Sequence, residues 1–216
     1  MYKKRILEGP PGMAVKEIWR SIVKSRASLV TILVAGVYAP AILQAQTKAN
    51  ATEKPFASGG KIDMQLSGGS YEIRPAAGNH IRVTLSGNVG NANVHVTTSG
   101  TRADVKVKDT PNNNFQATIE VPKAAEVVVR LTGGNLVIAA ITGNKDVESY
   151  AGNVQIVVGD PNEYSSVDAS VKAGDFNAGA FGGSKSGLFQ KFKWSGRGQY
   201  TLRAHLGAGN LELRSK

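Results

Sequence analysis

Apolar side chains recur at every second position along most of the chain between Ile62 and Leu213. The alternation is regular in short segments such as residues 81–85 and 154–158. A two-residue period places alternate side chains on one face of a strand, whereas a helix needs a period near 3.6 residues. No segment of this region has a convincing helical period. The sequence therefore predicts an all-β domain over residues 61–216.

Glycine-based corners interrupt the alternation at intervals. In each corner a glycine precedes Asn or Asp, residues that tolerate positive φ, and a new short strand of three to five residues follows. Four copies are clear, and they are Gly134-Asn135, Gly152-Asn153, Gly174-Asp175 and Gly209-Asn210. The Asn or Asp positions are 18, 22 and 35 residues apart.

Intervals near 20 residues are typical of the coils of a β-solenoid, in which stacked coils reuse one corner. The interval of 35 residues would hold an insertion or about two coils. Hairpins of a β-sandwich use similar corners. The recurrence of Gly-Asn or Gly-Asp immediately before an apolar residue favours the solenoid.

Residues 1–45 have the organisation of a secretory signal peptide. A basic region is followed by an apolar run of 17 residues, Ala27 to Leu43, and then by Ala45 and the polar Gln46. We expect a hydrophobic signal helix with cleavage between Ala45 and Gln46. An uncleaved membrane anchor is the alternative, because 17 apolar residues are near the shortest length that crosses a bilayer.

Translation from Met1 gives a long basic region before the apolar run, and a start at Met13 gives a shorter one. Both starts, and both fates of the signal, export the domain to the periplasm, the outer surface or the medium. The polar, small residues 46–60 are expected to form a flexible linker. Contact with a membrane is expected only through the N-terminal segment.

The charge of the chain is concentrated in this N-terminal segment. The sequence has 26 Lys and Arg against 16 Asp and Glu, and residues 1–45 hold seven of these bases and two of the acids. The remaining 19 bases and 14 acids give the rest of the chain a net charge of only +5. A thinly spread excess of this size does not predict nucleic-acid binding, and it suits acidic cell-surface polymers.

At these corners, and in the closing stretch KFKWSGRGQYTLRAHLGAGNLELR, the sequence resembles the bacterial putative-adhesin domains of unknown function, relatives of autotransporter-adhesin head domains. The resemblance covers residues 60–216. It implies a single-chain β-solenoid or β-roll at the cell envelope, with short strands stacked in parallel.

No cofactor or metal site is predicted. The chain has no cysteine, which excludes disulfides, thiolate zinc sites and a cysteine nucleophile. His80, His95 and His205 lie inside alternating strands and do not have a recognised metal-ligand spacing.

A polysaccharide-acting enzyme on a solenoid would need paired acids on one face. The candidates are Asp160, Glu163, Asp168 and Asp175. Asp160 precedes Pro161 in an expected turn, Asp175 occupies a corner, and Asp168 alternates outward. We therefore expect these acids to be structural and the protein not to be an enzyme.

The segment after Lys185 interleaves cations with aromatic residues. Lys191, Lys193, Trp194 and Arg197 are candidates for binding sugars or acidic polymers at the surface. In the alternative interpretation Phe192 and Trp194 pack on the inner face of the last hairpin and cap the fold, while the lysines outside block edge-to-edge aggregation.

Together these features predict an exported, non-catalytic module of the cell envelope with an adhesin-like binding or structural role. Its expected partner is an envelope or extracellular polymer, or another envelope protein. Two alternatives stay open. One is an envelope polysaccharide-acting enzyme on the same scaffold, and the other is a periplasmic sensor or assembly partner in envelope stress signalling.

Overall fold

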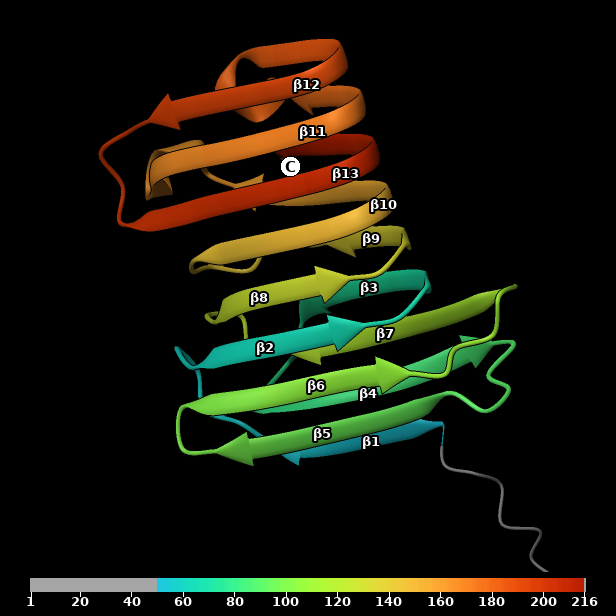
Figure 1. Ribbon diagram of the computed structural model, residues 1–216. Helices are drawn as coiled ribbons and strands as arrows, with labels where there is room; N and C mark the ends of the chain where they lie inside the picture. Colours follow the sequence, from blue (N-terminus) through green and yellow to red (C-terminus); the bar gives the residue numbers. More distant parts are fainter. Residues whose placement is uncertain (1–49, 216) are drawn as a thin grey trace, which may run out of the picture. The chain divides into compact units, whose positions relative to one another are not determined.

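The computed structural model describes residues 50–215 (Figure 1). The predicted signal helix, the junction between Ala45 and Gln46 and the two alternative starts lie outside the described residues. Within residues 50–215 no helix is long and apolar enough to cross a membrane. The elements are β1 (Ala51–Pro55), β2 (Lys61–Leu66), β3 (Gly69–Pro75), β4 (His80–Gly87), β5 (Asn93–Ser99), β6 (Arg102–Lys108), β7 (Phe115–Val121), β8 (Glu126–Leu131), β9 (Gly134–Ile138), β10 (Lys145–Gly159), η1 (Pro161–Glu163), β11 (Tyr164–Ala178), η2 (Gly179–Phe181), β12 (Gly183–Ser195) and β13 (Tyr200–Ser215).

The predicted all-β class is confirmed, since the 13 strands of the described region form one sheet and its two helices are single 3₁₀ turns. The sheet runs from β1 through β4, β7, β3 and β9 to β10, and then through β8, β2 and β6 to β5. Its two end strands, β1 and β5, lie next to each other (Figure 1). The sheet is therefore nearly closed and barrel-like.

Parallel pairing aligns the middle of the sheet. On one face β2, β8 and the first half of β10 pair in equal register, and on the other face β3, β9 and the second half of β10 do the same. The long strands β13 and β11 continue the stack beyond β10. Antiparallel pairs lie at the ends of the stack, where β12 joins β11 and β5 joins β6.

Inward-facing side chains fill the space between the two faces in columns. Register aligns Met64, Val129 and Val147 on one face, and Ile73, Ile138 and Ile156 on the other. Each of these six side chains is at most 1% exposed. Their burial against each other removes apolar surface from water, which is the main favourable contribution to folding.

The predicted corner glycines lie at the edge where the two faces meet. Gly152 has φ of 119° and Gly209 has φ of 121°, values that favour glycine. A Cβ atom at Gly152 would lie 1.8 Å from the carbonyl oxygen of Gly134, and one at Gly209 would lie 1.8 Å from that of Gly152. Because the glycines let the backbone bend without losing its pairing, β10 runs through the corner as one strand of 15 residues, longer than the expected three to five.

The expected linker ends earlier than predicted. Residues 51–55 form β1, which pairs antiparallel with β4, and Phe56 is 4% exposed in the core. β1 is an edge strand with mostly exposed side chains, so it lacks the apolar alternation that marks the other strands. The folded region therefore begins about ten residues before Lys61, the predicted start.

β13 does not lie at the end of the stack. It is inserted between β10 and β11, parallel to both, while β12 forms the terminal strand (Figure 1). This arrangement explains the interval of 35 residues between Asp175 and Asn210. The chain passes through β12 at the end of the stack and returns through β13 to the level below β11.

Candidate functional site

An open groove of about 610 Å³ lies beside the glycine corner. It crosses the strands that make up one face, from β6 to β11. We call it the corner groove, and its lining residues are Gln65, Leu66, Ser67, Val107, Lys108, Arg130, Leu131, Thr132, Glu148, Ser149, Tyr150, Ser170, Lys172, His205, Leu206 and Gly207.

The groove is basic. Lys108, Arg130 and Lys172 line it, together with the imidazole of His205, and Glu148 is the single carboxylate among its lining residues. Lys108 and Lys172 are exposed and make no ion pair within residues 50–215. Their positive charge is therefore available to an anionic ligand.

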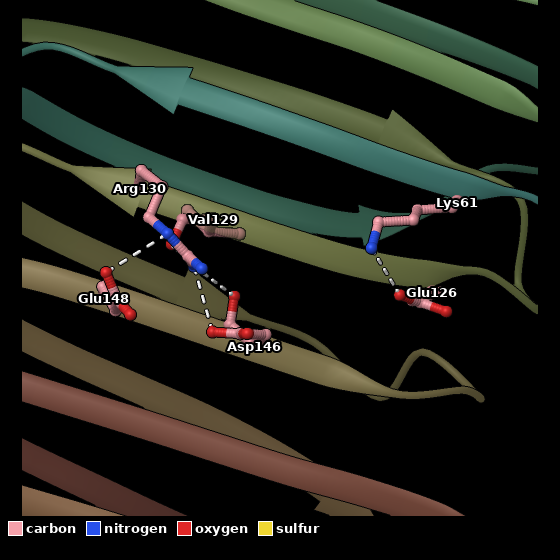
Figure 2. A network of polar contacts seen from close by, with 6 residues as sticks. All are labelled: Lys61, Glu126, Val129, Arg130, Asp146 and Glu148. Atoms are coloured by element: carbon pink, nitrogen blue, oxygen red, sulfur yellow. Dashed lines mark hydrogen bonds and ion pairs between the residues drawn. The ribbon is translucent and has the colours of Figure 1, made fainter.

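Arg130 is held in place by the neighbouring strand (Figure 2). Its Nη1 donates to the Asp146 carboxylate at 3.0 Å and to two backbone carbonyls, and its Nε lies 3.2 Å from Glu148. Its Nη2 makes no hydrogen bond among the described residues. The guanidinium is thus fixed by its acidic neighbours while one of its donor groups stays free.

A second ion pair lies farther along the same face. Lys61 of β2 contacts Glu126 of β8 at 2.9 Å (Figure 2), and this hydrogen bond to a carboxylate raises the pKa of Lys61. Both side chains are more than one third exposed. Exposed pairs of this kind contribute little to stability, so the pair mainly orders the lysine on the surface.

The groove also offers hydrogen-bonding and stacking groups. Tyr150 is 80% exposed, so its ring is open to solvent at the groove. The Ser170 hydroxyl lies 2.7 Å from Nδ1 of His205, and Ser67 and Thr132 add further hydroxyls. Aromatic rings beside hydroxyls and cations suit a polar, hydroxyl-rich ligand.

The asparagines of the predicted corners form a column on the adjacent face. Asn210 donates from its side-chain amide to Asn153, which donates to Asn135, both at 3.0 Å. The backbone amide of Asp175 extends the column to the Asn210 side chain at 3.4 Å. These side chains bond to each other across successive strands, which ties the corner together.

The predicted binding segment on β12 is divided between two sides of that strand. Trp194 is half-buried, with its ring centroid 4.9 Å from that of Phe181, and Phe192 packs against Phe176. Lys191 and Lys193 point away from the core and are exposed. Arg197 is exposed in the connection to β13. The arrangement agrees with the capping interpretation and does not bring the lysines and Trp194 together.

The predicted acidic candidates lie at three places in the fold, with Asp160 and Glu163 at the two ends of the single turn η1. Asp160 accepts a hydrogen bond from the backbone of Asn162 at the start of η1, Asp168 faces outward on β11, and Asp175 lies on the corner. Among the residues that the structure describes, no three His, Asp or Glu side chains are grouped so that they would hold a metal ion.

The core of the described region contains one buried lysine, which the sequence did not single out as a candidate. Lys145, at the start of β10, is 1% exposed. Its ammonium donates to the Ile141 carbonyl at 2.6 Å, the Gly143 carbonyl at 3.2 Å and the Tyr164 hydroxyl at 2.7 Å. Burial lowers the pKa of Lys145 to about 8 and raises the pKa of Tyr164. Lys145 does not line the corner groove, and its contacts are with the surrounding core.

The sequence analysis also missed the corner groove, although its signal is present. Counting back from each corner glycine places Arg130, Glu148 and His205 four residues before the corner, and Tyr150 and Lys172 two residues before it. Aligning the strands on their corner glycines would have gathered these side chains on one face.

The comparisons with known proteins concern the fold. No protein-family model and no curated protein matches this chain. Among solved structures it is similar to a "putative cell adhesion protein" from Clostridium sporogenes, with 12% identity, coverage of 77% of this chain and 99% of that chain, and a TM-score of 0.50. The two chains share a fold.

Two further solved structures match with lower scores. A "putative adhesin" from Parabacteroides merdae is 9% identical over 77% of this chain and 78% of its own, with a TM-score of 0.28. A "putative adhesin" from Parabacteroides distasonis is 12% identical over 76% of this chain and 68% of its own, with a TM-score of 0.27.

Proposed function

We propose that this protein is an exported, non-catalytic binding module of the cell envelope, built as a single-chain β-solenoid and related to bacterial adhesin domains. Its predicted signal segment, residues 1–45, would deliver it across the membrane. The corner groove would be its binding surface.

The observation that carries this proposal is the equal-register stacking of β2, β8, β10, β13 and β11. Stacking in register aligns the outward positions of successive strands and so presents rows of side chains on a rigid support. A row of weak contacts along one polymer gives high overall affinity through multivalency. The fold shared with a protein described as a cell adhesion protein is in keeping with this role.

The arrangement of acids favours binding over catalysis. Glycoside-cleaving enzymes place two carboxylates across a scissile bond. Asp168 and Asp175 lie on different faces, and Glu148 at the groove is committed to Arg130. A surface that holds a polymer without cleaving it fits this arrangement.

The test is made on native cells by protease shaving of intact cells together with the mass of the mature N-terminus. A chain that begins at Gln46 and is removed by external protease supports surface display. A full-length chain found in the cytosol overturns the proposal.

A further inference from the structure

Basic side chains occupy every second strand along one outward column of the corner face. Register aligns seven positions, and the basic ones are Lys106 of β6, Arg130 of β8, His205 of β13 and Lys191 of β12. Gln65 of β2, Glu148 of β10 and Ser170 of β11 alternate with them. None of the seven side chains is buried.

This alternation sets a distance between the basic side chains. Neighbouring strands lie about 4.8 Å apart, so basic groups on every second strand recur at about 10 Å. The column spans seven successive strands, which gives a ligand that lies along it four basic contacts.

The next column, farther from the corner, is richer in acids. It holds Asp104, Asp63, Asp146 and Asp168, two residues before the basic column on β6, β2, β10 and β11, together with Arg203 of β13 and Lys193 of β12. On the corner side, Lys108 and Lys172 add positive charge. A polyanion would therefore be attracted to the groove and repelled from the neighbouring column.

From this geometry we infer that the corner groove binds an extended acidic polysaccharide with one carboxylate per disaccharide, lying along the stack across the strands. The inference rests on the proposed function, because an exported domain meets such polymers outside the cell. The basic side chains would contact the carboxylates, and the intervening Gln65 and Ser170 would hydrogen-bond the sugar hydroxyls.

Arg130 is preorganised for this role. Its contacts with Asp146 and Glu148 fix the guanidinium, while Nη2 remains free to donate to a carboxylate. A cation that is already held in position loses little conformational entropy when it binds. Tyr150, exposed at the groove between Arg130 and His205, provides a ring face for a sugar.

The spacing distinguishes this ligand from nucleic acid. Along the axis of a nucleic-acid duplex, the phosphates of each strand recur at about 3.4 Å. Basic groups about 10 Å apart would leave most of them without a partner. A polymer with widely spaced carboxylates matches the spacing of the basic groups better. Its many hydroxyls also match the polar side chains that lie between them.

The experiment measures binding of the purified full chain to hyaluronate, which has one carboxylate per disaccharide, by calorimetry at low salt. Neutral hydroxyethylcellulose and oligo(dT) of similar length serve as comparison ligands. The double variant Lys106→Gln/Lys191→Gln removes the two outer basic groups, neither of which forms an ion pair in the described region. The matched control, Lys54→Gln/Lys123→Gln, removes two exposed lysines that do not belong to the column or the groove.

We expect hyaluronate to bind and the column variant to bind it about tenfold more weakly, with the control unchanged, because charge-assisted hydrogen bonds are lost only in the column variant. Absence of hyaluronate binding, equal losses in both variants, or equally tight binding of oligo(dT) would overturn the inference. The protease-shaving result is independent of these outcomes. A surface-displayed chain that does not bind hyaluronate would refute the ligand and leave the proposed function intact.

Discussion

The ammonium of Lys145 donates a hydrogen bond of 2.7 Å to the hydroxyl of Tyr164, and both side chains are at most 1% exposed. Tyr164 begins β11, 19 residues after Lys145. The Tyr164 hydroxyl is also within 3.3 Å of the Val158 carbonyl. The pair therefore connects the start of β10 with its far end and with the strand that follows.

The pH dependence of stability should reveal this buried amine. Its pKa is about 8 in the folded protein and 10.5 in an unfolded chain, so between these values the unfolded state binds more protons. The free energy of unfolding should then rise with pH across this window, by about 3 kcal/mol for this group. We expect the wild type to gain this amount between pH 8 and 10.5 relative to Lys145→Met, as measured by urea denaturation. A constant difference between the two proteins would contradict the assignment.

Replacing Gly152 by alanine should cost about 3 kcal/mol or more in the free energy of unfolding. The new Cβ would combine backbone strain at φ of 119° with an overlap at 1.8 Å from the Gly134 carbonyl oxygen. Gly100→Ala is the matched control, because Gly100 has φ of 56° but no atom within 4 Å of its Cβ position. The control should lose only about 1 kcal/mol, and similar losses in the two variants would rule out the close stacking.

Removing the hydroxyl of Tyr71 should leave stability unchanged or raise it by about 1 kcal/mol. This oxygen is buried and has no hydrogen-bond partner within residues 50–215, so it bears a desolvation cost without a compensating bond. Tyr71→Phe keeps the ring packed edge-on against Phe115, whose centroid lies 5.9 Å away. A thermal melt that shows clear destabilisation of Tyr71→Phe would indicate that the hydroxyl has a partner.

Trp194→Ala tests the capping role of β12. Truncation removes the ring that packs on Phe181, and we expect a loss of about 2 kcal/mol because the side chain is only half-buried. Hyaluronate affinity should remain within twofold of the wild type when measured well below the melting temperature. If stability is kept and binding is lost, Trp194 contacts ligand and the capping role fails.

The strands and corners of this fold were accessible from sequence because they depend on local rules. Alternation follows from two-sided strands with one buried face, and positive φ selects glycine at Gly134, Gly152, Gly174 and Gly209. The phase of the alternation even places Lys145 inward, since it is two residues before Val147. Lysine is rarely buried, so its residue type alone argues against a core position there.

The order of the strands in the sheet could not be predicted from local sequence patterns. The position of β13 between β10 and β11 depends on contacts between residues 35 and 57 positions apart, which no local pattern records. The edge strand β1 lacks a buried face and so lacks a periodic signal. The corner groove was missed because it gathers two or three residues from each of six strands, so no single segment of the sequence marks it.

The insertion of β13 has a consequence for the order of assembly. β11 and β12 precede residues 200–215 in the chain and pair with each other, but only β13 connects this hairpin to β10 and the rest of the sheet. The hairpin of β11 and β12 can therefore join the sheet only after β13 has paired with β10. A polypeptide built in this way completes its native sheet only after residues 200–215 are available, so the last strand of the sequence controls the final step of assembly.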